Sequence, residues 1–219
     1  MDLFYFDIET CGNFKDFQSF KENDPKGAAL FEKKYQKMGW DSKFDINDSY
    51  LDQSPIISTY GRICCISFGY ISDTGDNRIS SYYGDNEREI VEKFNDLLKK
   101  IEQKNFNLSG FRINYFDIPW ILHKLHKYGI VPASIINPYG KKPWDLRVTD
   151  MSDDWKQRFA YMSSFDEVCY ELGVKSPKGE MDGSMVHGSY WNGEFDKIKD
   201  YCENDVIASI EVSKLIYKK

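Results

Sequence analysis

The order of strand-like and helix-like segments is the feature that most constrains how this chain can fold. Three runs rich in strand-forming residues come early, and helical and strand-like runs then alternate. The strand-like runs are 2–8, 61–71, 78–83, 106–111 and 143–148, and the helical runs are 26–38, 86–103, 117–128, 163–172 and 194–217. This order predicts an α/β protein with a mixed sheet flanked by helices.

A polar stretch separates the first strand-like run from the second. Residues 11–60 are rich in charge, contain scattered aromatic side chains and include one helical pattern, at 26–38. A structureless loop of this length would be unusual inside a compact domain, so we expect a folded insertion or a lid. The full length of 219 residues fits one domain, 1–219, with approximately 11–60 as the insertion.

Composition excludes several classes of protein. Hydrophobic residues make up 41% of the chain and charged residues 29%, which fits neither a disordered nor a fibrous protein. No apolar run approaches the roughly 20 residues that a membrane helix needs, and the amino end carries acid where a secretory signal would carry base. Five cysteines without a CxxC pair argue against a disulfide framework and predict a reducing, cytoplasmic location.

The net charge of −6 disfavours binding of nucleic acid through overall positive charge. Clustered carboxylates can still hold a phosphate if they recruit divalent metal, because the ion reverses the local sign of the field. This possibility directs attention to acids that stand among apolar residues.

Asp7 and Glu9 follow a strongly apolar strand-like run and are separated by one residue. Side chains two apart on a strand point to the same side, so both carboxylates should leave the end of the strand together. Nothing nearby in sequence neutralises them, and a hard divalent cation is the natural partner. The alternative is a pair of solvated acids at a strand end.

Asp117 and Asp205 are two further acids in apolar surroundings. Asp117 stands at a strand-to-helix passage, where it could instead cap the helix. Asp205 lies on the face of the last helix that is expected to point inward, one turn after Tyr201, and the alternative is a buried aspartate satisfied by hydrogen bonds. Nearby Tyr115, Phe116 and Trp120 could stack on bases or belong to the core.

The acids Asp7, Glu9, Asp117 and Asp205, together with Tyr201, resemble the DEDD (DnaQ-like) exonuclease superfamily in their order and spacing, in its tyrosine-bearing (DEDDy) branch. The resemblance is to the predicted PolB-like 3′-5′ exonucleases, and it covers most of residues 1–212. It is carried further by the segments 61–68, 116–119, 172–178 and 181–184. Arg112 departs from the pattern, because relatives often have Asn there.

The resemblance implies a ribonuclease H-like fold with a five-stranded sheet and a metal-dependent 3′-5′ exonuclease. It implies two divalent ions, Mg²⁺ or Mn²⁺, about 3.5 to 4 Å apart and held by the four acids. Tyr201 would orient the attacking water, because an unperturbed phenol with a pKa near 10 is a poor base. The expected substrate is the 3′ end of single-stranded nucleic acid, and DNA is favoured over RNA. A DNA polymerase or repair protein is a possible partner.

Two other functions fit parts of the pattern. A nucleic-acid-binding or polymerase-partner module of the same fold would use residues 11–60 for assembly and have little activity. A metal-dependent phosphatase for small nucleotides would keep the acids but need a closed pocket. Retention of all four acids and Tyr201 favours the exonuclease.

Overall fold

One mixed sheet organises the computed structural model, which describes residues 2–142, 145–158, 161–179 and 181–217. The strand order is β3-β2-β1-β4-β5. The strands are β1 (Leu3–Gly12), β2 (Gly61–Ile71), β3 (Asn77–Tyr83), β4 (Asn107–Gly110) and β5 (Val148–Asp150). The first three strands are antiparallel neighbours, and β4 and β5 run parallel to β1. The predicted mixed five-stranded sheet is confirmed.

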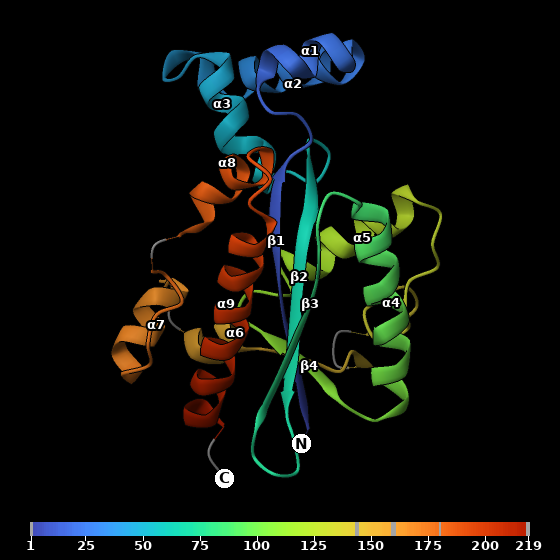
Figure 1. Cartoon of the computed structure of the whole chain (residues 1–219), viewed down its shortest axis with the longest axis vertical. Coiled ribbons are helices and arrows are strands. Elements are labelled where there is room, and N and C mark those ends of the chain that lie inside the picture. The colour runs from blue at the N-terminus through green and yellow to red at the C-terminus, as the bar shows by residue number, and fades with distance from the viewer. Residues whose placement is uncertain (1, 143–144, 159–160, 180, 218–219) are drawn as a thin grey trace.

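Helices cover both faces of this sheet, which makes a three-layer α/β/α arrangement (Figure 1). Helices α4 (Glu87–Gln103) and α5 (Asp117–Lys127) lie on one face, and α9 (Phe195–Ile216) crosses the other. The remaining helices are α1 (Phe17–Asn23), α2 (Pro25–Lys37), α3 (Ile46–Gln53), α6 (Met151–Lys156), α7 (Phe165–Leu172) and α8 (Val186–Trp191), with 3₁₀ turns η1 (Trp40–Ser42), η2 (Ser54–Ile56) and η4 (Gly183–Met185). None of the helices described combines the length and apolar character that crossing a bilayer requires.

Strand β1 distributes its side chains between two environments. Phe4, Phe6 and Ile8 enter the main core, which they share with α4 and α5. The intervening positions face α9, because side chains alternate along a strand, and there Tyr5 packs against α9. Asp7 and Glu9 belong to this second set, so the same alternation that builds the core directs two carboxylates toward the last helix.

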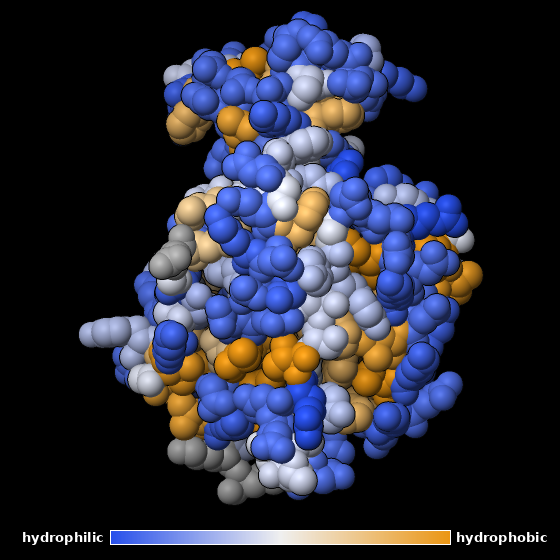
Figure 2. Space-filling model, viewed as in Figure 1, coloured by the Kyte–Doolittle hydropathy of each residue, from blue (hydrophilic) through white to orange (hydrophobic). Residues whose placement is uncertain are grey.

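The insertion folds around an aromatic core of its own. Phe17, Phe20, Phe31, Tyr50 and Tyr60 are all buried together there. Helices α1 to α3 stand beyond one end of the sheet, above a narrowing of the molecule (Figures 1 and 2). The folded insertion is thus confirmed, although sequence periodicity predicted only α2. Helices α1 and α3 have only 7 and 8 residues, too few to show a clear apolar period. Each begins at an aspartate cap, which is a common residue in loops as well.

Two strand predictions need correction. The run 143–148 was predicted as a strand, yet β5 covers only Val148–Asp150, and 143–144 lie outside the described residues. The reason is that β4 is a strand of four residues, and β5 pairs with only its last three. In the opposite direction, the first strand does not end near Ile8 but continues to Gly12, because its last residues pair with the start of β2.

Candidate active site

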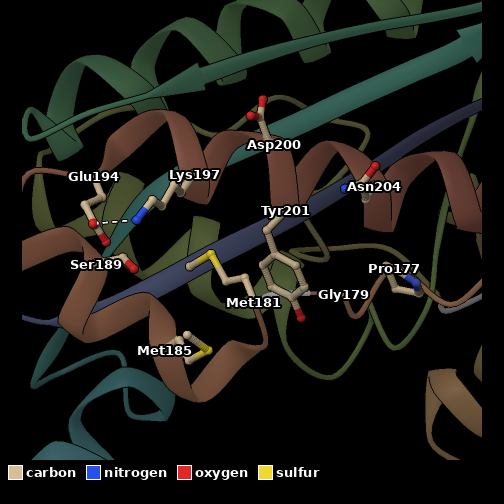
Figure 3. A pocket seen from close by; sticks show the side chains of 10 residues that line it. All are labelled: Pro177, Gly179, Met181, Met185, Ser189, Glu194, Lys197, Asp200, Tyr201 and Asn204. Carbon is tan, nitrogen blue, oxygen red and sulfur yellow. Dashed lines mark hydrogen bonds and ion pairs between the residues drawn. The ribbon is translucent and has the colours of Figure 1, made fainter.

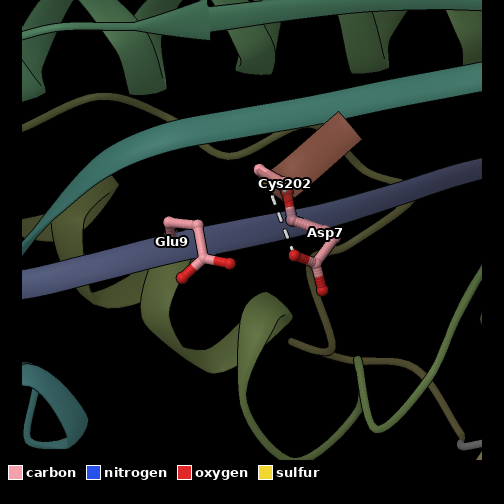
Figure 4. Close-up of side chains that lie close together, drawn as sticks. All are labelled: Asp7, Glu9 and Cys202. Atoms are coloured by element: carbon pink, nitrogen blue, oxygen red, sulfur yellow. Dashed lines mark hydrogen bonds between the residues drawn. The ribbon is translucent and has the colours of Figure 1, made fainter. Parts of the chain in front are cut away.

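Asp7 and Glu9 project side by side from the middle of β1 (Figure 4). The predicted position at the strand end is therefore wrong, while the predicted common direction is confirmed. Pairing of β1 with β4 stops at Tyr5 and Ser109, whereas pairing with β2 continues to Gly12. Both carboxylates consequently lie just beyond the point where the sheet divides between β1 and β4.

Asp117 reaches this division from the start of α5. Its Oδ1 accepts a hydrogen bond of 3.0 Å from the backbone N–H of Ile8, a donor that β4 leaves free. The cap residue of α5 is Phe116, and Asp117 occupies the first helical position with a side chain only 3% exposed. Asp117 is therefore not the cap of α5, because its carboxylate bonds to β1 instead.

Helix α9 brings Tyr201 and Asp205 to the same place. One face of this helix packs on β1, β2 and β3 through buried residues that include Ile198, Cys202 and Val206. Tyr201 and Asp205 flank that face and are partly buried. The Oδ2 atom of Asp205 is buried and has no hydrogen-bond partner among the described residues, so the alternative of a fully satisfied aspartate does not hold.

All five predicted site residues line one open groove of about 560 Å³. Its walls also include Ile56 from the end of the insertion, together with Arg112, Tyr115 and Phe116 from the loop between β4 and α5. Tyr115 is 57% exposed, whereas Trp120 is 4% exposed and belongs to the core. Of the three aromatic residues with two possible roles, Trp120 is therefore structural, and the other two face the groove.

The pKa values of all four carboxylates are raised. Burial is the main cause for each of them, and charge repulsion from neighbouring acids adds to it. The pKa of Asp117 rises to about 8 and that of Asp205 to about 7, while those of Asp7 and Glu9 lie well above their ordinary values. Buried acids this close together are costly to ionise without a cation, and the unpaired oxygen of Asp205 is free to bind one. The residues therefore fit a divalent metal centre.

Tyr201 keeps its proton in this environment. Burial raises the pKa of its phenol, and the nearby carboxylates of Asp205, Glu9 and Asp7 raise it further. Its ring also forms part of a second hollow, of about 350 Å³, whose lining includes Met181 and Met185 and, at one end, the Glu194–Lys197 ion pair (Figure 3). Tyr201 thus stands between two hollows, with a hydroxyl that can donate a hydrogen bond at neutral pH.

Comparison with known proteins identifies the family. Residues 55–212 match the family model described as "Predicted 3'-5' exonuclease related to the exonuclease domain of PolB". The chain belongs to this family. Within the PolB-related exonuclease family, the matched segment includes Asp117, Tyr201 and Asp205, while Asp7 and Glu9 precede it.

Solved structures support the same fold for this PolB-related exonuclease family member. One match is the structure of the family B DNA polymerase from the hyperthermophilic archaeon Pyrobaculum calidifontis, with a TM-score of 0.58 and 13% sequence identity. The match covers 99% of this chain and 24% of the polymerase, so the chain spans about a quarter of the polymerase's length. A search of curated proteins gave no significant match.

Asp150 is a buried residue of the site region that sequence analysis missed. Its carboxylate accepts hydrogen bonds from the backbone N–H groups of Arg112, at 2.9 Å, Asn114, at 2.9 Å, and Ser152, at 3.0 Å. It therefore fixes the loop that leads from β4 to Asp117. The only sequence signal for this role is an aspartate between a strand and a helix. That position indicates an ordinary helix cap just as well, so it does not single out Asp150.

Arg112 adopts a left-handed backbone conformation in that loop, with φ of +63°. Asn adopts this conformation at lower cost than most residues with a side chain. The backbone therefore accounts for the Asn that is expected at this position in similar exonucleases. The Arg side chain lines the groove. The departure from the family pattern is therefore compatible with the local fold and adds a cation near the carboxylates.

Proposed function

We propose that this chain is a 3′-5′ exonuclease of the DEDDy type that removes nucleoside 5′-monophosphates from the 3′ end of single-stranded DNA. The observation that carries the proposal is the meeting of Asp7, Glu9, Asp117, Asp205 and protonated Tyr201 in one groove. Membership of a predicted exonuclease family supports the reaction type. A binding module would not need this set of side chains.

The carboxylates of Asp7, Glu9, Asp117 and Asp205 would hold two divalent ions, Mg²⁺ or Mn²⁺. When bound, these ions supply the positive charge and the acidified water that phosphodiester hydrolysis requires. The burial that raises the acids' pKa values also excludes competing solvent from them. In this role the hydrogen bond from Ile8 to Asp117 fixes one carboxylate relative to the strand that carries the other two.

Tyr201 would orient the attacking water through its hydroxyl group. Because its pKa is raised, the phenol donates a hydrogen bond and does not act as a base. Tyr115 and Phe116 line the groove and offer aromatic faces on which an unpaired base can stack, which suits a single strand better than a duplex. Arg112 would hold a phosphate of the same strand.

Several wider assignments belong to the same proposal. Residues 1–219 would act as one exonuclease domain with 11–60 as an insertion that serves as a lid or a docking unit. The resemblance to part of a family B polymerase supports work beside a DNA polymerase or repair protein. The five free cysteines support a cytoplasmic location.

Oligonucleotides labelled at the 3′ or the 5′ end test the reaction directly. With Mg²⁺ or Mn²⁺, we expect stepwise shortening from the 3′ end, and with a chelator no shortening. Asp7→Ala should reduce the rate at least about 100-fold, since it removes a group that stabilises the charge of the transition state. Asp73→Ala, in the exposed turn between β2 and β3, is the matched control and should leave the rate unchanged. Undiminished cleavage by Asp7→Ala would overturn the site assignment.

A further inference from the structure

The thiol of Cys202 lies directly against the carboxylate of Asp7 (Figure 4). Its Sγ donates a hydrogen bond to the backbone oxygen of Asp7 at 3.4 Å and lies 3.6 Å from Oδ2 of the same residue. Cys202 is fully buried, in an apolar cluster that also contains Cys65 of β2. A soft sulfur atom that can bind metal therefore lies beside hard carboxylate oxygens that can do the same.

Glu9 completes a set of three ligand atoms. One oxygen of Asp7, one oxygen of Glu9 and the Sγ of Cys202 all lie within 4.8 Å of one another. The Glu9 side chain is 9% exposed, points into the site beside Asp7, and makes no hydrogen bond or ion pair within the described part of the chain. A largely buried carboxylate without a partner indicates that a cation belongs there.

The spacing suits a tetrahedral metal. Zinc binds thiolate sulfur at about 2.3 Å and carboxylate oxygen at about 2.0 to 2.2 Å, so in a tetrahedral site these two atoms lie about 3.5 Å apart. The observed separation between Sγ of Cys202 and Oδ2 of Asp7 is 3.6 Å. Zinc could thus bind with little movement of either side chain.

We propose that Asp7, Glu9 and Cys202 form a site for a thiophilic divalent cation, Zn²⁺ or Cd²⁺. On binding, the S–H bond of Cys202 loses its proton to solvent and a metal–sulfur bond forms, with no change of oxidation state. Mg²⁺ gains nothing from sulfur, so the thiol distinguishes soft ions from the hard ions of the proposed reaction. Because the soft ion occupies Asp7 and Glu9, it inhibits cleavage. This inhibitory part rests on the proposed function, whereas the binding itself does not.

The ultraviolet charge-transfer absorption of a cadmium–thiolate bond tests binding without any assay of activity. Titrating the metal-free protein with Cd²⁺ should give this absorption and saturate at one ion per chain. Cys202→Ala should abolish it, and Cys169→Ala, which alters a buried thiol in another cluster on α7, should retain it. Thermal unfolding of both variants without metal establishes that they are folded. If Cys202→Ala does not fold, Asp7→Asn replaces it and should weaken the binding of Cd²⁺ at least about tenfold.

Inhibition is measured separately, with Zn²⁺ added to a reaction containing excess Mg²⁺. Cys202→Ala should raise the Zn²⁺ concentration needed for half inhibition at least about tenfold, because the loss of a direct ligand costs at least as much as that of an outer-shell partner. Absorption that is absent from the wild type or persists in Cys202→Ala overturns the metal site. Absorption that behaves as expected in a protein that does not cleave DNA refutes the nuclease proposal alone.

Discussion

The carboxylate of Asp117 accepts a hydrogen bond from the backbone N–H of Ile8 across 109 positions of sequence. This contact stands where the next hydrogen bond of the β1–β4 ladder would be, and it holds a mid-chain acid against the strand that carries Asp7 and Glu9. Opening of the sheet and assembly of the acid cluster are therefore one structural event.

The stability of the metal-free protein should fall as the pH rises from about 4 to about 8. Asp205 has a pKa of about 7 and Asp117 of about 8 in the folded protein, against about 3.9 when unfolded. In that window the folded protein holds protons that the unfolded protein has released, so each rise in pH favours unfolding. Thermal unfolding at several pH values, with chelator present, measures the slope.

Mn²⁺ should remove most of this pH dependence, and Asp7→Asn should reduce it in the absence of metal. The variant deletes one of the mutually repelling charges, so it should melt several degrees higher than the wild type at pH 8 in chelator. It should also gain little stability from Mn²⁺. Comparing the two proteins at each pH cancels the contribution of His187, whose pKa is lowered by burial. An unchanged slope in Asp7→Asn would contradict the electrostatic coupling described above.

Tyr201→Phe should lower the rate of cleavage about 10- to 100-fold, the effect of losing one orienting hydrogen bond. Affinity for Mn²⁺, measured by calorimetry, should be nearly unchanged, because the phenol is protonated and is not among the expected ligands. Tyr190→Phe provides a comparison in a buried tyrosine of α8 whose hydroxyl accepts a hydrogen bond from Arg62. Equal loss of metal affinity and rate in Tyr201→Phe would make its role structural.

Asp150→Ala should destabilise the protein by about 2 to 4 kcal/mol, because it leaves several backbone donors without an acceptor. It should also weaken Mn²⁺ binding, since the loop it fixes carries Asp117. Asp150→Asn retains the side-chain oxygen that accepts hydrogen bonds from the N–H groups of Arg112 and Ser152. The losses of stability and of Mn²⁺ affinity should therefore both be smaller than in Asp150→Ala. Urea unfolding and calorimetry measure them, and undiminished metal affinity in Asp150→Ala would restrict Asp150 to a structural role.

Arg112→Asn should stabilise the protein by about 0.5 to 1 kcal/mol, because Asn adopts a positive φ at lower cost. Arg112→Ala is the matched variant, since it also removes the guanidinium but does not relieve the backbone. Both should raise KM for a single-stranded substrate by a similar factor if the guanidinium holds phosphate. A KM that changes in neither variant argues that Arg112 points away from the bound strand.

Periodicity and alternation were sufficient for most of the sheet and for the longer helices. Helix α4 and strand β2 were predicted almost to the residue, because an amphipathic helix and a buried strand carry their own local pattern. The extension of β1 to Gly12 was not predictable in this way, since it depends on pairing with residues about 50 positions later. Helices α6 and α8, of six residues each, were missed because they complete less than two turns.

The membership of the candidate site was available from sequence only through the order and spacing of its acids. Each acid alone had an ordinary alternative, and Asp117 shows why: a carboxylate near a helix start commonly caps it, and only the fold shows that it bonds to β1 instead. Cys202 carried no signal as a ligand, because its place beside Asp7 arises from the packing of α9 on the sheet.

The packing of α9 on the sheet also determines when the site can form during protein synthesis. Tyr201, Cys202 and Asp205 all belong to α9 (Phe195–Ile216), so the site around Asp7 and Glu9 cannot form until translation has passed this helix. A nascent chain still lacking this helix would bind divalent ions weakly and, under the proposed function, could not degrade nucleic acid beside the ribosome. Activity would begin only once the helix has docked.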